Sequence, residues 1–339
     1  MTTVGILTGG GDCPGLNAAI RGVVARVLCE PDGRVIGFRN GWAGLMQSDW
    51  TELDRDAVRG ILTRGGTILG TSRMDPFVHG DGAVSVRRSF TETGIDSLVV
   101  IGGDGTLRAA GRLSDEGLPI IGIPKTIDND IPGTDRTFGF DTAVQIATDA
   151  IDRLTTTAEA HNRVMLVEVM GRSQGWIALC AGMAGGADAI LVPEFPQRLE
   201  DVAASLERRH ARGARYSLVV VAEGIAPPEP VDLPRDAYGF ARLGTVSYQV
   251  APILEHLTGF ETRVTILGHL QRGGTPTASD RILATRLGVV AAEAALAGKT
   301  GAFTALRGDE VVIAPLDEAC GDPRPVDAGR YEVATRFFG

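Results

Sequence analysis

The chain has 339 residues, 44% of them hydrophobic and 22% charged, and a formal net charge of −9. This length exceeds what one ordinary hydrophobic core fills, so two domains are expected. The acidic balance, with no basic stretch, argues against nucleic acid or an anionic membrane as a partner. No apolar run approaches the roughly 18 residues of a membrane span. The 4 cysteines are scattered without zinc spacing, which is typical of reduced thiols, so the sequence predicts a soluble cytoplasmic protein.

Short β-branched runs recur along the chain and are apolar throughout, which is typical of strands buried on both faces of a parallel sheet. They lie at residues 4–7, 35–38, 98–101, 120–123, 164–169, 189–192, 218–221 and 264–267. Helical patterns lie between them, at residues 16–28, 142–154, 199–212, 246–257 and 281–297. This alternation predicts an α/β fold with right-handed crossovers. The polar, proline-rich interval 226–234 is expected to be a surface loop.

Polar or glycine-rich segments follow five of these runs. They read TGGGDCPG, GGDGT, PKTIDND, MGRSQG and GHLQRGG in chain order. Ligands bind at the carboxyl ends of strands in open parallel sheets. The five segments are therefore the candidate ligand-binding loops.

The GGDGT segment has the features of a phosphate-binding turn. Its glycines, Gly103 among them, let backbone N–H groups approach a phosphate, and a helix beginning at Thr106 would add its positive end. Asp104 suits Mg²⁺, which prefers a carboxylate together with waters and substrate phosphates. The alternative is a plain tight turn with Asp104 as a helix cap. TGGGDCPG permits the same close approach at residues 9–11, and it lacks the dinucleotide fingerprint G-x-G-x-x-G.

The segment PKTIDND combines a lysine with two carboxylates. Lysine occurs only at Lys125 and Lys299, so 33 − 2 = 31 of the basic residues are arginine. Asp128 and Asp130 can reach one pocket, where one carboxylate acts as general base and the other orients it or helps hold a metal. The alternative is an Asx-type turn. Phosphoryl transfer fits these pieces, because it needs positioning, charge neutralisation and a carboxylate on the nucleophilic hydroxyl.

Several cations follow downstream. Arg172 and Arg272 lie in glycine-flanked loops at strand ends, where a guanidinium can bind phosphate through two nitrogens. Most of the other arginines are expected to be surface charges. Glu223 ends a strand and can accept sugar hydroxyls or cap the next turn.

Taken together and in this order, the motifs TGGGDCPGLNAAIRG, GGDGT, PKTIDNDI, VEVMGR and LGHLQRGGTPTASDRILATR resemble the phosphofructokinase family from residue 4 to about residue 295. The resemblance implies the phosphofructokinase fold: two three-layer α/β domains with largely parallel sheets and the active site between them. We expect residues 1–138 with about 270–320 to bind the phosphoryl donor. Residues 139–269 with about 321–339 would bind the sugar phosphate. The implied activity is the glycolytic phosphorylation of fructose 6-phosphate at its 1-hydroxyl, with Mg²⁺ as cofactor.

The resemblance also assigns roles. It implies that Asp128 is the base, that Asp130 is the second aspartate of the motif, that Thr126 lies near the transferred group, and that Asp104 holds Mg²⁺. The implied donor-site residues are Gly11, Arg73, Met74, Gly103, Gly105 and Thr106. The implied sugar-phosphate residues are Met170, Gly171, Arg172, Glu223, His269 and Arg272. Arg163 and Arg263 match arginines contributed across a subunit interface, which implies a homo-oligomer, usually a tetramer.

Two positions bear on the phosphoryl donor. Lys125 matches pyrophosphate-dependent members, whereas ATP-dependent members typically have glycine there. Gly105 matches ATP-dependent members, because aspartate at this position would crowd and repel the nucleotide α-phosphate. We therefore expect ATP as donor, with pyrophosphate as the alternative. A lipid or NAD kinase sharing only GGDGT, or a non-catalytic sugar-phosphate sensor, would lack the other motifs. Basic effector-site residues are replaced at Ala25, Thr155, Ala214 and Tyr216, so control by ADP or phosphoenolpyruvate is expected to be weak.

Overall fold

The computed structural model describes residues 2–78, 80–235, 237–239 and 243–338. The chain divides into two units. The first comprises Met1–Thr142 and Arg272–Pro323, and the second comprises Ala143–Gln271 and Arg324–Gly339. The assignment of the phosphoryl donor to the first unit and of the sugar phosphate to the second stays a prediction.

The first unit is built on one mostly parallel sheet with the strand order β12-β11-β5-β4-β1-β2-β3, and β6 pairs with β5 off this path. The strands are β1 (Thr2–Thr8), β2 (Gly33–Phe38), β3 (Trp50–Glu52), β4 (Ser97–Gly102), β5 (Ile120–Thr126), β6 (Phe138–Gly139), β11 (Ala302–Arg307) and β12 (Glu310–Pro315). The two edge strands, β3 and β12, run antiparallel to their neighbours. The apolar runs occupy the centre of the sheet, where both faces are covered.

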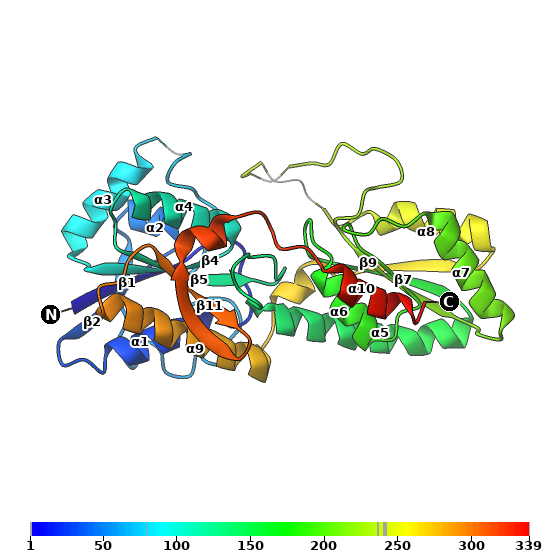
Figure 1. Ribbon diagram of the computed structural model, residues 1–339, viewed down its shortest axis with the longest axis horizontal. Coiled ribbons are helices and arrows are strands. Elements are labelled where there is room, and N and C mark those ends of the chain that lie inside the picture. Colours follow the sequence, from blue (N-terminus) through cyan, green and yellow to red (C-terminus); the bar gives the residue numbers. More distant parts are fainter. Residues whose placement is uncertain (1, 79, 236, 240–242, 339) are drawn as a thin grey trace. The chain divides into compact units, whose positions relative to one another are not determined.

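Helices cover both faces of this sheet (Figure 1). They are α1 (Leu16–Val27), α2 (Trp42–Met46), α3 (Gly82–Thr93), α4 (Asp104–Asp115) and α9 (Ala278–Leu296). α1 and α9 lie side by side on one face, and α2, α3 and α4 lie on the other. Glycines allow the close contact of α1 with α9, because a Cβ at Gly22 would lie 2.7 Å from the carbonyl oxygen of Thr285.

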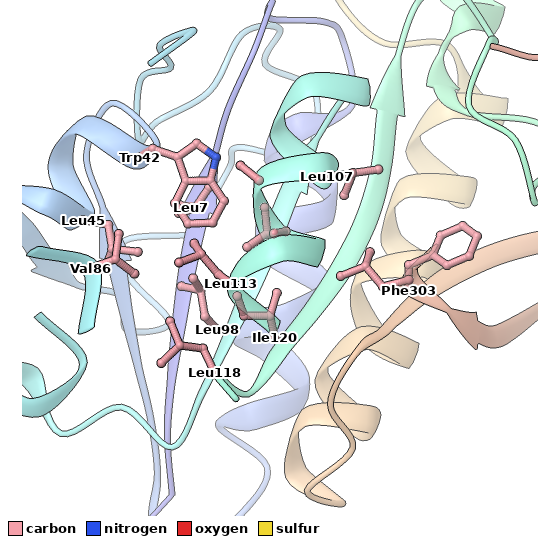
Figure 2. Packing of buried hydrophobic residues seen from close by; sticks show 14 of the residues in the cluster. Leu7, Trp42, Leu45, Val86, Leu98, Leu107, Leu113, Leu118, Ile120 and Phe303 are labelled. Atoms are coloured by element: carbon pink, nitrogen blue, oxygen red, sulfur yellow. The ribbon is translucent and has the colours of Figure 1, made fainter. Parts of the chain in front are cut away.

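One hydrophobic cluster of the first unit lies between the sheet and the helices α2, α3 and α4. Leu7, Trp42, Leu98 and Leu113 are at most 1% exposed, and Figure 2 shows them packed together with Phe303 of β11. Burying one such side chain contributes about 1.5–3 kcal/mol. The cluster joins segments from both ends of the chain, so the unit forms only when strands such as β11 pack with the amino-terminal strands.

The second unit has a four-stranded parallel sheet with the order β10-β7-β9-β8. Its strands are β7 (Val164–Val169), β8 (Ala189–Leu191), β9 (Ser217–Ala222) and β10 (Thr262–Ile266). Its helices are α5 (Phe140–His161, which begins in the first unit), α6 (Trp176–Ala184), α7 (Leu199–Ala211), α8 (Ser247–Thr258) and α10 (Ala328–Thr335). α7 and α8 pack together over one face, whereas α6 covers β8 and β9 and contacts α10 (Figure 1).

The predicted α/β class with largely parallel sheets is confirmed, and all eight predicted strands and five predicted helices are present. Residues 226–234 form a mostly exposed loop, as expected. The prediction missed β3, β6, β11 and β12 among the strands. β12 is exposed at both ends and mostly half-buried between them, and it begins with a charged residue, Glu310, so a search for fully apolar, fully buried runs passes over it. In the described part of the chain, no helix is long and apolar enough to span a membrane.

Candidate active site

The glycine segment after β1 is held mainly by its own backbone. The N–H of Gly9 donates to the carbonyl of Ile101 at 2.9 Å, and the N–H of Gly10 donates to the carbonyl of Ser72 at 2.8 Å. Gly10 has a φ of +80°, which favours glycine. The expectation that these glycines offer their N–H groups to a phosphate is therefore wrong at Gly9 and Gly10. Those two groups already have partners, and they fix the loop.

Two cations hold the same loop from inside the first unit. The Lys125 ammonium, on a residue only 2% exposed, donates to the carbonyl of Gly11. The Arg272 guanidinium donates to the carbonyl of Asp12 at 3.2 Å, and a Cβ at Gly11 would lie 2.7 Å from its Nη1. Burial lowers the pKa of Lys125, and the positive charge of Arg272 lowers it further. Arg272, which the resemblance places at the sugar phosphate, thus packs on the glycine loop.

The segment Arg73–Met74 lies beside this loop. Thr71 donates its hydroxyl to the carbonyl of Gly10 at 2.6 Å, and Ser72 accepts the N–H of the same glycine. Arg73 and Met74 follow directly and are half-buried. The structure therefore brings these two predicted donor-site residues to the glycine loop.

The GGDGT turn places its acid at the start of a helix. α4 begins at Asp104, two residues before the predicted start, with Gly103 as N-cap. The Thr106 side chain packs so closely on the glycines that a Cβ at Gly102 would lie 2.4 Å from it. The Arg108 Nε donates to Asp104 Oδ1 at 2.6 Å. Gly105 is exposed on the first turn, and a Cβ there would meet nothing within 4 Å.

The segment PKTIDND comprises the end of β5 and the turn after it, and it is held by Thr137, the residue before β6. Thr137 donates its hydroxyl to the carbonyl of Thr126 at 2.8 Å and its N–H to Asn129 Oδ1 at 3.0 Å. The Asp128 N–H donates to the Thr126 hydroxyl at 3.0 Å. Asn129 has a φ of 54°, in the left-handed region that asparagine tolerates. These turn-forming bonds involve Asn129 and Thr126, and they leave the carboxylate of Asp128 out.

The carboxylate of Asp128 is buried with one oxygen unsatisfied. The residue is 4% exposed, and its Oδ1 has no hydrogen-bond partner among the residues that the structure describes. Buried polar atoms in native proteins nearly always have a partner. The carboxylate of Asp128 therefore keeps one hydrogen-bond acceptor that no described residue uses. Asp130, at 9% exposed, is buried on the same segment.

In the second unit, a glutamate and a glutamine hold the MGR turn. Glu223 Oε1 accepts the N–H groups of Gly171 at 3.3 Å and Arg172 at 3.0 Å. Gln271 Oε1 accepts the N–H of Met170 at 3.3 Å. Arg172 has a φ of 52°, an unusual conformation for a residue other than glycine. The predicted residues 170–172 and Glu223 thus form one cluster, and one oxygen of Glu223 positions the turn.

Arg163 and Arg263 form a separate cluster at the amino ends of β7 and β10, whereas the Met170–Arg172 turn follows the carboxyl end of β7. Glu261 bridges them, accepting from Arg163 Nε at 2.8 Å and pairing with the Arg263 guanidinium. The hydrogen bond from Arg163 lowers the pKa of Glu261. His269, by contrast, lies exposed in the short 3₁₀ helix Gly268–Arg272, on the loop that follows β10.

Sequence reasoning missed three residues that hold these loops: Thr137, Glu261 and Gln271. Gln271 lies within the quoted motif GHLQRGG, yet it is fully buried and could have been singled out as a polar residue between a strand and a helix. Thr137 and Glu261 carry no signal of their own. Thr137 bonds Thr126, 11 residues away, and Glu261 bonds Arg163, 98 residues away; these two pairings are not visible in a single sequence.

Comparison with known proteins agrees with this arrangement of loops. The family model "Phosphofructokinase" matches residues 3–295. This chain belongs to the phosphofructokinase family.

Relatives within the phosphofructokinase family differ in the donor they are named for. The chain is 52% identical to ATP-dependent 6-phosphofructokinase 3 of Streptomyces coelicolor, over 98% of both chains. It is 50% identical to pyrophosphate–fructose 6-phosphate 1-phosphotransferase of Amycolatopsis methanolica, over 99% of both chains. The crystal structure of Pichia pastoris phosphofructokinase superimposes with a TM-score of 0.84 at 34% identity. This match covers 99% of the present chain and 36% of the Pichia chain.

Proposed function

We propose that this phosphofructokinase transfers the terminal phosphoryl group of ATP to the 1-hydroxyl of fructose 6-phosphate. Relatives of nearly equal identity are named for ATP and for pyrophosphate, so identity alone does not choose the donor. The observation that carries the choice is the open space at Gly105, where a Cβ would meet nothing within 4 Å. Gly105 itself carries no side chain and no charge that would crowd or repel a nucleotide α-phosphate at this turn.

Asp128 is the proposed general base. Its unpartnered Oδ1 accepts the proton of the sugar hydroxyl as that oxygen attacks phosphorus. The bonds from Thr137 to Thr126 and Asn129 keep the segment in place during this step. The charge of the transferred group is met by Lys125, which lies beside the glycine loop, and by Arg172. These groups supply positioning and charge neutralisation, the two needs of phosphoryl transfer.

Asp104 is the proposed residue for Mg²⁺. An ion that arrives with a polyphosphate needs one or two protein carboxylates, with waters and phosphate oxygens as the other ligands. Asp104 offers a half-exposed carboxylate, 39% exposed, on the first turn of α4, and its Oδ1 accepts from Arg108. When bound, the ion neutralises charge on the donor phosphates.

The sugar phosphate is proposed to bind in the second unit. The turn Met170–Arg172, Glu223 and His269 supply donors and acceptors from the ends of three neighbouring strands. We further propose a homo-oligomer in which Arg163 and Arg263 reach the sugar phosphate of a neighbouring copy. This proposal is supported by the ion pairs of Glu261 with both guanidinium groups, which hold them close together.

Pyrophosphate is the second candidate donor, and Lys125 favours it. A buried ammonium beside the glycine loop suits a compact polyphosphate as well as the end of ATP. Its bond to the Gly11 carbonyl also gives this lysine a structural role that is independent of the donor.

Initial rates on fructose 6-phosphate with Mg·ATP and with Mg·pyrophosphate test the proposal directly. We expect ATP to give a kcat/KM at least about 100-fold higher. At about 1.4 kcal/mol for each factor of ten, this corresponds to about 2.8 kcal/mol of transition-state free energy. A preference for pyrophosphate would overturn the assignment of the donor. Absence of both activities from a folded protein would overturn the assignment of the reaction.

A further inference from the structure

Asp280, at the start of α9, is one of the most completely buried carboxylates of the first unit. It is 0% exposed, and no role in binding or catalysis is assigned to it above. Its Oδ2 accepts the N–H of Thr142 at 2.8 Å and the hydroxyl of the same threonine at 2.6 Å. Thr142 is the third residue of α5, whose first N–H groups have no partner inside the helix. Asp280 therefore caps α5 from a residue 138 positions further along the chain.

A second set of bonds links the same place to α9. The Thr277 hydroxyl donates to Asp141 Oδ2 at 2.6 Å, and the Thr277 N–H donates to the Thr142 hydroxyl at 3.1 Å. Thr277 is also the N-cap of α9, since its hydroxyl accepts the N–H of Asp280. The first turns of α5 and α9 thus cap one another.

The start of α5 is continuous with β6, the strand that pairs with the end of β5 before Asp128. β6 ends at Gly139 and α5 begins at Phe140. In the register of β5 with β6, Lys125 pairs with Phe138 and Thr126 pairs with Gly139. A displacement of the start of α5 would therefore move β6 and the end of β5 that leads into Asp128.

Burying a carboxylate at this position costs desolvation free energy. Burial and the negative charge of Asp141 raise the pKa of Asp280 to about 6, and the hydrogen bonds from Thr142 and Gly139 oppose this rise. Its Oδ1 has no partner among the described residues. An apolar side chain would avoid this cost but would leave the two donors of Thr142 unsatisfied.

We propose that Asp280 is a positioning residue for phosphoryl transfer, which fixes the start of α5 and, through β6, the strand end that carries Thr126 and leads into Asp128. The inference depends on the proposed role of Asp128. It does not depend on the identity of the donor.

The test compares Asp280→Leu with the conservative Asp280→Asn. Leucine removes the oxygen that accepts both bonds from Thr142, so we expect kcat to fall at least about tenfold, while the KM for fructose 6-phosphate stays within about twofold. Amide hydrogen exchange in residues 126–142 should become faster, measured by mass spectrometry on the full chain. Asparagine keeps an oxygen for Thr142, so D280N should restore kcat to within about threefold of wild type.

Asp141→Leu is the matched control. It removes an acidic side chain from the same turn of α5, together with its bond to Thr277, but leaves the cap on Thr142 intact. We expect its kcat to stay within about twofold of wild type. An equal loss in D141L and D280L would mean general destabilisation of the turn, and it would overturn the proposal.

Two further results complete the test. A folded D280L with wild-type kcat and unchanged exchange would overturn the proposal, whichever donor the wild type uses. If D280L does not fold, Thr142→Val removes the hydroxyl bond to Asp280, together with the bond that this hydroxyl accepts from the Thr277 N–H, and keeps the shape of the side chain. T142V should then lower kcat about two- to fivefold and speed exchange in residues 126–142, and no effect would overturn the proposal. Inactivity of the wild type on fructose 6-phosphate would instead contradict the proposed function.

Discussion

The segment PKTIDND (residues 124–130) of the first unit and the Met170–Arg172 turn of the second unit are held by different kinds of bond. In the first unit, threonines, an asparagine and backbone groups hold the segment, and Oδ1 of Asp128 has no partner among the described residues. In the second unit, a carboxylate and a buried amide hold the turn, at Glu223 and Gln271. The first arrangement leaves one oxygen of Asp128 unpaired among the described residues, which suits the general base proposed for it. The second uses its polar groups for shape, which suits binding.

The largest expected effect follows from the carboxylate of Asp128. Asp128→Asn keeps the size of the side chain but removes the base, so we expect kcat to fall by about 10²–10⁴. The KM for fructose 6-phosphate should change by less than about threefold, because the base acts in the transition state. Steady-state kinetics on a variant with wild-type Tm measures both. Turnover within tenfold of wild type would contradict the role of Asp128.

A smaller effect is expected where the donor meets α4. Gly105→Asp places a negative charge at the open first turn, so we expect the KM for ATP to rise about tenfold through repulsion of the donor phosphates. Gly105→Ala is the matched control, because a Cβ there meets nothing within 4 Å, and its KM should stay within about twofold. Equal KM values for the two variants would show that charge at this position does not select the donor.

The binding side of the comparison is tested at Gln271. This residue is fully buried, accepts the Met170 N–H and donates to the Gly268 carbonyl at 3.1 Å. Gln271→Leu leaves both groups unsatisfied, at a cost of about 1–3 kcal/mol. We expect the KM for fructose 6-phosphate to rise about three- to tenfold, and kcat at saturating sugar to change by less than threefold. A fall in kcat with unchanged KM would reverse the division of roles between the two loops.

The smallest effect on activity, with a measurable effect on stability, is expected from the ionisation of Asp280. Its pKa is about 6 in the folded protein, against 3.8 for a solvated aspartate, so unfolding releases a proton between these pH values. The stability of the wild type relative to D280N should therefore fall as pH rises from about 4 to about 6, by up to about 3 kcal/mol. Thermal unfolding of both proteins across this range measures the difference. A constant difference in Tm would show that the carboxyl is not buried as described.

The sequence predicted the central strands and the loops that follow them, because fully apolar runs and glycine clusters are local signals. The roles of Asp128 and Asp104 were inferred in the same way, from short motifs, and stay predictions. It did not predict that the N–H groups of Gly9 and Gly10 are bound to Ile101 and Ser72, nor that Arg272 packs on the glycine loop. Those facts depend on pairings between distant segments, which local patterns do not contain. The edge strand β12 was missed because its half-exposed pattern has weak periodicity.

The contact between α1 and α9 has a consequence for how the protein is made. α1 comes from the first 30 residues, whereas α9 and the strand β11 that completes the sheet lie beyond residue 272. During translation, the emerging amino-terminal segment cannot bury the face of α1 that receives α9. The whole stretch Ala143–Gln271 leaves the ribosome before that partner arrives. The chain thus departs from the usual order in which the amino-terminal domain folds first, and the nascent protein carries an unfinished apolar face through most of its synthesis.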